Sequence, residues 1–166
     1  MGRARKLPTR DELRVWREFV ETTEALRSVL AGRLHQDTGL SRSDYAVLLV
    51  LSEASGHRLR SSELAARIGW ERSRLSHHLN RMERRHLIRR EECAVDSRGA
   101  EVVLESAGAE AFRAATVPHL RAVRELFVDA LTADQLAAAA EIATALRAHL
   151  ARPAPSPPGQ AGTPEE

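Results

Sequence analysis

The two ends of this chain carry helical patterns of apolar residues that are too long for one small domain to cover. One pattern runs from Asp11 to about His35, over roughly six turns, and another from Ser106 to Leu150. In a chain of 166 residues, the segment between them is too short to bury both stripes, so we expect an oligomer. The last stripe has a spacing typical of packed helices, within one chain or between two, at Leu136, Ala139, Ala143, Leu146 and Leu150.

Composition excludes several classes of protein. The chain is 43% hydrophobic and 29% charged, as in an ordinary globular domain. A single cysteine, Cys93, cannot form an intramolecular disulfide, and the basic start lacks the apolar stretch of a signal peptide. The single cysteine favours a reducing cytoplasm, and because no run of about 18 apolar residues is present we expect no membrane-spanning segment.

We expect one folded domain between two flexible ends. Residues 1–10 are basic, and chain ends fray unless they are tied down. Residues 151–166 contain five of the seven prolines and no large apolar side chain, which predicts a disordered tail. Residues 11–150 then form a single α+β domain, mainly α, in which the long helices of 11–35 and 106–150 flank a central unit in 41–105.

Local signals divide the chain into shorter elements. Serine or threonine precedes most of the helical patterns and glycine follows several, as expected for caps. β-type residues lie on both sides of a polar turn, which predicts a hairpin. The expected elements are a helix from Ser41 to about Gly56, a short helix from Ser61 or Ser62 to Gly69, a helix from Glu71 to about Arg85, strands in Leu87–Val95 and Ala100–Leu104 around the turn Asp96–Gly99, a helix that Ser106 caps and that runs to about Leu131 with a kink at Pro118, and a last helix from Thr132.

Positive charge is concentrated in the central unit. Residues 57–98 contain eleven arginines and six acidic residues, a formal charge of +5 in a chain whose net charge is +2. An arginine-rich face is often only a solvated surface, so charge alone is a weak indication of a nucleic-acid site. At 100° per residue, one side of the helix of residues 71–85 is inward-facing, with Leu75, Leu79, Met82 and His86. The other side has no acidic residue and carries Ser73, Arg74, Ser76, His77, Asn80, Arg81 and Arg84.

That polar face suits a groove of double-stranded DNA. Arginine can bond guanine O6 and N7 together, asparagine can pair with adenine, and serine can hold a phosphate. Gly69 and Trp70 form a short turn between this helix and the one before it, as a helix-turn-helix requires. At the tip of the hairpin, Arg98 is placed to enter an adjacent minor groove. Asp96 is placed to hold Arg98, or is simply a turn aspartate.

These segments resemble the MarR family of winged helix-turn-helix transcriptional regulators over roughly Leu13 to Leu150. The likeness rests on SSELAARIGWERSRLSHHLNRMERRHLIRR, on Asp96-Ser97-Arg98, which is similar to the family's wing motif, and on Leu104 to Gly108, which is similar to its Leu-Thr-x-x-Gly element. The resemblance implies a homodimer joined by the terminal helices, a palindromic operator, and usually repression relieved by a small ligand or by oxidation. We therefore interpret 11–35 and 106–150 as dimerisation helices and 41–105 as the winged helix-turn-helix.

The chain departs from the family pattern at the wing, where Arg98 is one tip arginine in place of the two of many relatives, and at two residues beside the predicted recognition helix. His86 stands where the family often has a glycine after the recognition helix, so we expect a positive φ there. Glu71 replaces the more usual Ser, Asp or Thr before that helix, which puts the cap in doubt. With Asp96 orienting the wing, the residues expected at the DNA are Arg60, Ser61, Ser62, Arg72, Ser73, Arg74, Ser76, His77, Asn80, Arg81, Arg84, Ser97 and Arg98.

The family also implies a ligand crevice between the dimerisation helices and the winged lobe. Arg33, His35 and Tyr45 are candidate polar contacts for a small aromatic or anionic effector. Ordinary core and surface roles are the alternative. The apolar residues expected around them are Leu30, Leu34 and Leu48.

Other functions are less well supported by the residues. The seven histidines lack a zinc-ligand spacing with cysteine, and no set of nucleophile, base and orienting group indicates an enzyme or a cofactor. Arg89 and Arg90 near Cys93 favour a reactive thiolate, but peroxide-sensing relatives resemble one another in carrying a cysteine in the N-terminal helical region, where this chain has none. The main alternative is a winged helix that binds a protein partner without specific DNA binding.

Overall fold

The computed structural model of the chain describes residues 7–92 and 100–152. These divide into two compact units, one within Met1–Leu126 and the other within Phe127–Glu166. Within the described ranges, no helix is both long enough and apolar enough to cross a membrane. The architecture is mainly helical with one small antiparallel sheet, which confirms the predicted fold class.

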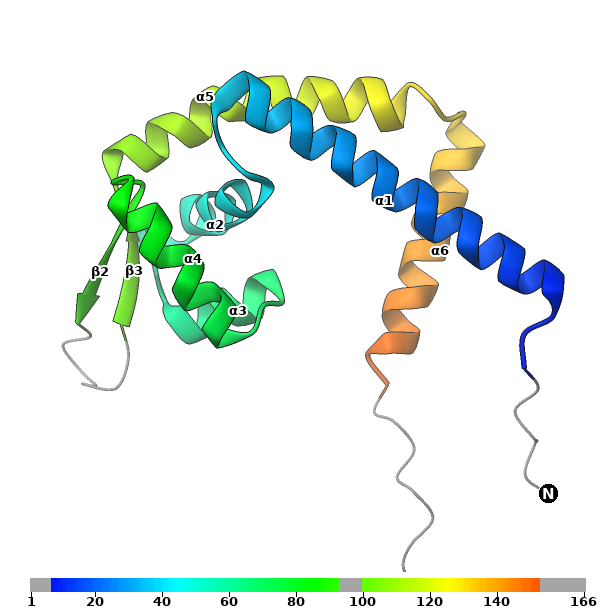
Figure 1. Ribbon diagram of the computed structural model, residues 1–166, viewed down its shortest axis with the longest axis horizontal. Helices are drawn as coiled ribbons and strands as arrows, with labels where there is room; N and C mark the ends of the chain where they lie inside the picture. The colour runs from blue at the N-terminus through cyan, green and yellow to red at the C-terminus, as the bar shows by residue number, and fades with distance from the viewer. Residues whose placement is uncertain (1–6, 93–99, 153–166) are drawn as a thin grey trace, which may run out of the picture. The chain divides into compact units, whose positions relative to one another are not determined.

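Two long helices pack along each other in the first unit. They are α1 (Arg10–Thr38) and α5 (Ser106–Val123), drawn in blue and yellow-green in Figure 1. A capping box between Thr9 and Glu12 starts α1, and Gly39 ends it in the left-handed conformation, with φ of 71°. Near its start, α1 leaves Trp16 62% exposed and Phe19 49% exposed, so part of its apolar surface is uncovered within one chain.

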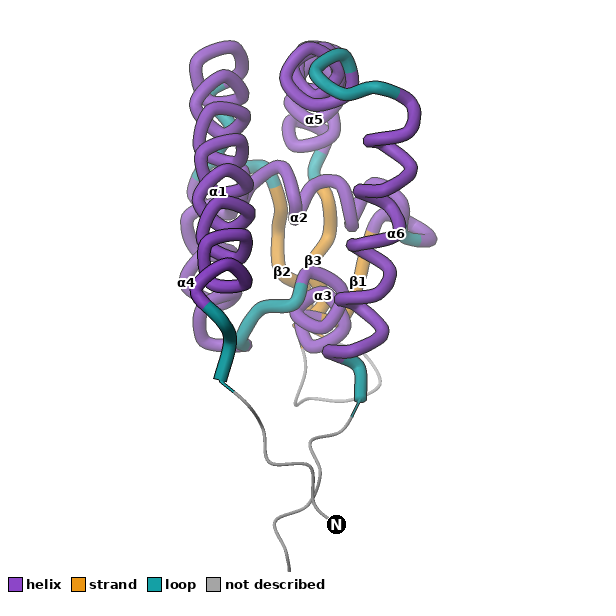
Figure 2. The backbone as a smooth tube through the Cα atoms, turned by 90° about the vertical axis from the view of Figure 1, so that its right-hand side faces the viewer, coloured by secondary structure: helices purple, strands orange, loops and turns teal. Residues whose placement is uncertain are grey.

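The central segment forms a winged lobe of three helices and a sheet (Figures 1 and 2). The strands are antiparallel in the order β1-β3-β2, so the hairpin β2–β3 is joined by a third strand. The elements are α2 (Arg42–Glu53), the 3₁₀ turn η1 (Ser55–His57), β1 (Arg58–Arg60), α3 (Ser61–Ile68), α4 (Arg72–Arg84), β2 (Ile88–Glu92) and β3 (Ala100–Leu104).

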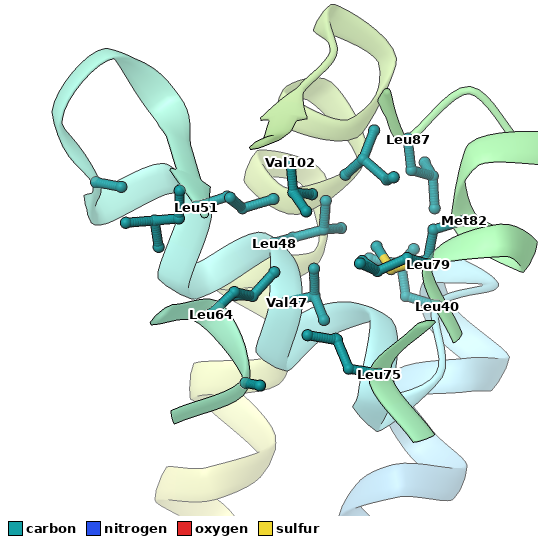
Figure 3. Close-up of a cluster of buried hydrophobic side chains, with 14 of the residues drawn as sticks. Leu40, Val47, Leu48, Leu51, Leu64, Leu75, Leu79, Met82, Leu87 and Val102 are labelled. Carbon is teal, nitrogen blue, oxygen red and sulfur yellow. The ribbon is translucent and has the colours of Figure 1, made fainter. Parts of the chain in front are cut away.

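The hydrophobic core lies where α2, α3, α4 and β3 meet. Leu48, Leu64, Leu79 and Val102 come from these four elements and are fully buried, and their side chains converge in Figure 3. Burial of such a side chain stabilises a fold by about 1.5–3 kcal/mol. The core therefore fixes the inner side of α4 and leaves its outer side to solvent.

A close backbone contact joins the hairpin to α5. The carbonyl of Leu87 accepts a hydrogen bond of 3.2 Å from the amide of Glu105, just before α5 begins. Gly108 packs over the same carbonyl, and a Cβ on Gly108 would lie 2.0 Å from the Leu87 oxygen. Only glycine allows this approach, which explains the glycine of the Leu104–Gly108 segment.

Several predicted element boundaries are confirmed and one cap is wrong. Ser41 caps α2 and Thr132 caps α6 (Ala133–Leu150) in the second unit, both through capping boxes. Ser106 does not cap α5, because Glu105 holds the N-cap position without a side-chain hydrogen bond and Ser106 is already helical. The helix continues through Pro118 to Val123, and a π-helical turn follows, η2 (Arg124–Val128), in place of the predicted continuation to Leu131.

The second unit consists mainly of α6, and the later part of its predicted apolar stripe is exposed. Leu136 and Ala139 are half-buried, whereas Leu146 is about half exposed and Leu150 is 81% exposed. Ile142, which is outside the predicted stripe, is also about half exposed. An amphipathic helix that leaves such residues in water has unburied apolar surface available for another surface.

Candidate nucleic-acid interface

A short turn at Gly69 and Trp70 joins α3 to the start of α4. Gly69 ends α3 with φ of 67°, a conformation that glycine adopts without strain. Its own amide donates to the carbonyl of Ala66, and the amide of Trp70 donates to the carbonyl of Ala65. Glu71 is the N-cap of α4 but makes no side-chain cap bond, as expected. The first backbone N–H groups of α4 are therefore not taken up by a side-chain cap.

The two sides of α4 differ as the sequence predicts, with one exception. Leu75, Leu79 and Met82 are buried in the core. His86 is exposed rather than inward-facing, because α4 ends at Arg84 and His86 lies beyond it with φ of 55°. The positive φ predicted for His86 is confirmed. The exposed side of α4 comprises Arg72, Ser73, Arg74, Ser76, His77, Asn80, Arg81 and Arg84, all of them predicted DNA contacts.

A buried carboxylate contacts the buried side of α4. Asp44, in the first turn of α2, is 3% exposed and accepts a 2.8 Å hydrogen bond from Arg85 just after α4. Its other oxygen lies 3.0 Å from Nε2 of His78, a close contact in which the ring N–H is not aligned for a regular hydrogen bond. Arg85 also donates to the carbonyl of Gly39. Asp44 thus joins the start of α2 to the middle of α4 and to Arg85 just after that helix, and Arg85 in turn bonds the end of α1.

The environment of Asp44 keeps it ionised. Burial alone would raise the pKa of its carboxyl group, but His78, the Ser41 amide and Arg85 together hold that pKa well below its ordinary value. The Ser41 amide donates to Asp44 over 2.9 Å, which also caps α2. The sequence predicts Ser41 as a cap and does not predict the contacts of Asp44, because its partners lie 34 and 41 residues along the chain.

An aromatic contact holds Arg74 at the start of α4. Its guanidinium carbon lies 4.5 Å from the centre of the Trp70 ring. Trp70 in turn presents its ring nearly perpendicular to His78, with 5.5 Å between ring centres and 86° between planes. Arg81 donates a 3.0 Å hydrogen bond to Nδ1 of His78. Since a guanidinium can only donate, Nδ1 accepts and Nε2 carries the ring proton toward Asp44.

The residues predicted before α4 are only partly available to DNA. Arg60 and Ser62 are exposed at the start of α3. Ser61 is half-buried, and its hydroxyl donates a 2.9 Å hydrogen bond to the carbonyl of Ala100 at the start of β3. Ser61 therefore ties the start of α3 to the start of β3, at the turn end of the hairpin. Asp96, Ser97, Arg98 and Cys93 lie outside the described residues.

The hairpin is held by charge pairs. Arg58 on β1 contacts Glu91 on β2 and Glu101 on β3, each at 3.3 Å. Glu83 at the end of α4 accepts hydrogen bonds from the side chain and the amide of Arg90, which lower the pKa of its carboxyl group. These contacts fix the hairpin against β1 and against α4.

The predicted effector residues do not all lie together. Leu34 and Leu48 are buried and Leu30 is half-buried, while His35 is exposed. Arg33 forms a bidentate pair with Glu125 across 92 positions, at 2.7 and 2.9 Å, so its guanidinium is already occupied. That pairing lowers the pKa of the Glu125 carboxyl group.

Tyr45 has aromatic partners that the sequence does not predict. Its ring centre lies 5.2 Å from that of Phe112 and 4.7 Å from that of His119, both on α5. Nδ1 of His119 is buried without a hydrogen-bond partner among the described residues, and burial lowers the pKa of its ring. Phe112 and His119 are seven residues apart, a spacing that places them on one side of a helix and that could have indicated this cluster.

Within residues 7–92 and 100–152, no group of three or more His, Cys, Asp or Glu side chains is arranged to hold a metal ion.

Known proteins match the chain in both sequence and fold. A family model described as MarR family matches residues 38–99. The structure of AbsC, a MarR family transcriptional regulator from Streptomyces coelicolor, shares 36% sequence identity over 87% of this chain and 97% of its own, with a TM-score of 0.80. Sco3205, a MarR family transcriptional regulator from the same organism solved in complex with DNA, shares 34% identity over 91% of this chain and 94% of its own, with a TM-score of 0.84. A comparison with curated proteins finds no match.

Proposed function

Since this chain belongs to the MarR family of transcriptional regulators and carries a DNA-binding winged helix, we propose that it is a repressor that binds a palindromic operator as a homodimer. The observation that carries the proposal is the exposed side of α4, which has eight polar or basic side chains and no acidic one. A helix of this kind fits the major groove of double-stranded DNA, where its N-terminal residues reach base edges. From the sequence we further propose that Arg98 contacts the adjacent minor groove and that Ser97 is a second DNA contact of the same turn.

The homodimer is supported by apolar surface that one chain leaves exposed. Trp16 and Phe19 on α1 and Leu146 and Leu150 on α6 all belong to the stripes predicted for the terminal helices. Covering them with a second copy would remove that apolar area from water, at roughly 25 cal/mol per Å². A two-fold dimer carries two recognition helices related by symmetry, and for this reason we propose a palindromic operator.

Selection from a random duplex pool, followed by fluorescence anisotropy at several salt concentrations, tests the DNA-binding proposal. We expect an inverted repeat with half-sites about one helical turn apart, bound by two chains with a steep loss of affinity as salt rises. Arg74→Ala should lower the preference for one base pair by roughly 1–3 kcal/mol, the range for a bidentate contact. Arg113→Ala, at an exposed arginine of α5, is the matched control and should leave that preference unchanged.

One outcome would contradict the proposal, and another would change the role of Arg74 within it. A pool without enrichment, bound weakly and without regard to sequence, would mean that the basic patch is only electrostatic and would favour a protein-interaction module. A uniform loss of affinity in Arg74→Ala across all sequences would make Arg74 a phosphate contact rather than a base contact.

We also propose that a small aromatic or anionic effector modulates DNA binding near Tyr45. The support is the aromatic cluster with Phe112 and His119, in which a buried ring nitrogen has no partner among the described residues. An aromatic carboxylate would stack on these rings and offer an acceptor for a ring N–H. The occupied guanidinium of Arg33 makes that residue a weaker candidate than Tyr45.

A thermal-shift screen with aromatic carboxylates checks the effector proposal. A ligand at 100 times its Kd should raise the melting temperature by about 5 °C or more. Tyr45→Ala should abolish the rise, whereas His35→Ala, at an exposed position, should retain it. A screen in which no aromatic carboxylate shifts the melting temperature would count against this class of effector.

A further inference from the structure

Four arginines on and around α4 are held by side chains of the protein, in two different ways. Arg85 bonds Asp44, Arg90 bonds Glu83, and Arg81 bonds a ring nitrogen of His78, so each of these guanidiniums uses N–H groups inside the protein. Arg74 makes no ion pair in the described part of the chain, and its guanidinium carbon lies over the Trp70 ring, 4.5 Å from the ring centre.

This difference matters because a guanidinium reads a base with its N–H groups. A carboxylate partner would occupy two of the five N–H donors, and any base would have to compete for them. An aromatic ring attracts the charge through its face and takes up none of the five. The Trp70 contact therefore restrains the guanidinium while leaving all of its donors available for a base edge.

The Trp70 ring is itself held by residues of the protein interior. It packs against the hydrophobic core, and its contact with His78 is edge-on. His78 is 5% exposed and lies between Asp44 and Arg81. A line of contacts thus runs from the buried carboxylate of Asp44 through His78 and Trp70 to Arg74 on the exposed side of α4.

We propose that Trp70 is a positioning residue for sequence recognition, which sets the base preference of Arg74 without touching DNA. The proposal rests on the proposed function, in which Arg74 contacts a base. Ordering a free arginine on binding costs side-chain entropy, and a side chain already held over a ring loses less of it. The advantage applies only to the base pair that Arg74 reads, so Trp70 should affect selectivity at one position of each half-site.

A double-mutant cycle tests the proposal with the full-length chain and the selected duplex. Trp70→Met keeps a long apolar side chain but removes the ring face. Its preference at the base pair read by Arg74 should fall about two- to fivefold, as expected for loss of an exposed cation–π contact. Preferences at the other positions should stay unchanged, and in an Arg74→Ala background Trp70→Met should cause no further loss.

Rescue and stability controls separate positioning from folding. Trp70→Phe restores a ring and should recover most of the preference, while the melting temperature of each variant reports its stability. If Trp70→Met does not fold, Trp70→Leu takes its place in the cycle.

The outcomes distinguish this inference from the proposed function. A loss of preference of the same size with and without Arg74, or an equal loss at every position, would overturn the role of Trp70. A wild-type chain without any base preference would instead overturn the proposed function itself.

Discussion

Replacing Gly108 with alanine is expected to destabilise the fold by about 3 kcal/mol or more, which is the upper part of the range for overpacking. The new Cβ would lie 2.0 Å from the oxygen and 2.9 Å from the carbon of the Leu87 carbonyl. These are backbone atoms that cannot rotate away as the end of a side chain can. The start of α5 and the loop before β2 must therefore separate, which strains the hydrogen bond between Glu105 and Leu87.

Thermal unfolding at a fixed protein concentration measures this effect. A loss of about 3 kcal/mol corresponds to a fall of roughly 6–12 °C in melting temperature for a chain of this size. Gly32→Ala is the matched control, since Gly32 lies inside α1 and a Cβ there meets nothing within 4 Å. That variant should be unchanged or stabilised by up to about 1 kcal/mol, because alanine is the better helix former. Equal melting temperatures for Gly108→Ala and the wild type would show that the contact is not as tight as the structure has it.

Replacing Asp44 with alanine is expected to cost about 3 kcal/mol and to loosen α4. The change leaves the buried ring of His78 and the guanidinium of Arg85 without their carboxylate, and loss of one partner of a buried pair typically costs 3–5 kcal/mol. We take the lower end because Arg85 is 45% exposed and can reach water. Urea unfolding of the two proteins at neutral pH gives the difference in free energy.

The pair Glu63–Arg67 provides a control that matches the geometry but not the burial. Its N–O distance is 2.7 Å, against 2.8 Å for Arg85 and Asp44, but both side chains are 46% exposed. Glu63→Ala should therefore cost no more than about 0.5 kcal/mol. If the two alanine variants lose the same stability, burial of Asp44 is not what makes its contacts strong.

The contribution of Asp44 to the free energy of unfolding should decrease as the pH falls. Its pKa is lowered in the folded chain, so the unfolded chain takes up a proton first as the pH falls. The stabilisation is fully present above the ordinary aspartate pKa of about 3.9 and is lost progressively below it. The difference between the wild type and Asp44→Ala should stay constant from pH 7 to about pH 5 and shrink at lower pH. A difference that grows on acidification would contradict the lowered pKa.

How far the sequence predicts this molecule depends on how local each signal is. The helix starts at Ser41 and Thr132 are correctly predicted, because a capping box involves residues only three apart. The strand Arg58–Arg60 is not predicted, since three residues carry no period and the strand exists only through pairing with β3, more than forty positions away. The exposed side of α4 can be predicted from the helical period of its apolar and polar residues alone.

The contacts that hold α4 in place beneath this exposed side cannot be predicted from a sequence pattern. Nothing about Asp44 in the sequence distinguishes an aspartate in a capping box from one that also meets His78 and Arg85. Likewise, Trp70 is predicted as a turn residue, and its contact with Arg74 depends on the rotamers of two side chains. The prediction that Ser106 caps α5 fails because the helix begins at Ser106 itself, which leaves Glu105 as the N-cap.

The division of α4 into two sides has a consequence for how such proteins diversify. The residues that hold the lobe together, such as Leu75 and Met82, are separate from those that face outward, such as Asn80 and Arg84. A duplicated gene can therefore change its target sequence by substitutions on the outer side without having to find a new core. Arg74 is the exception, because its partner Trp70 packs on that core. We expect descendants of one ancestor to drift at the outer positions first and to change the Trp70–Arg74 pair together.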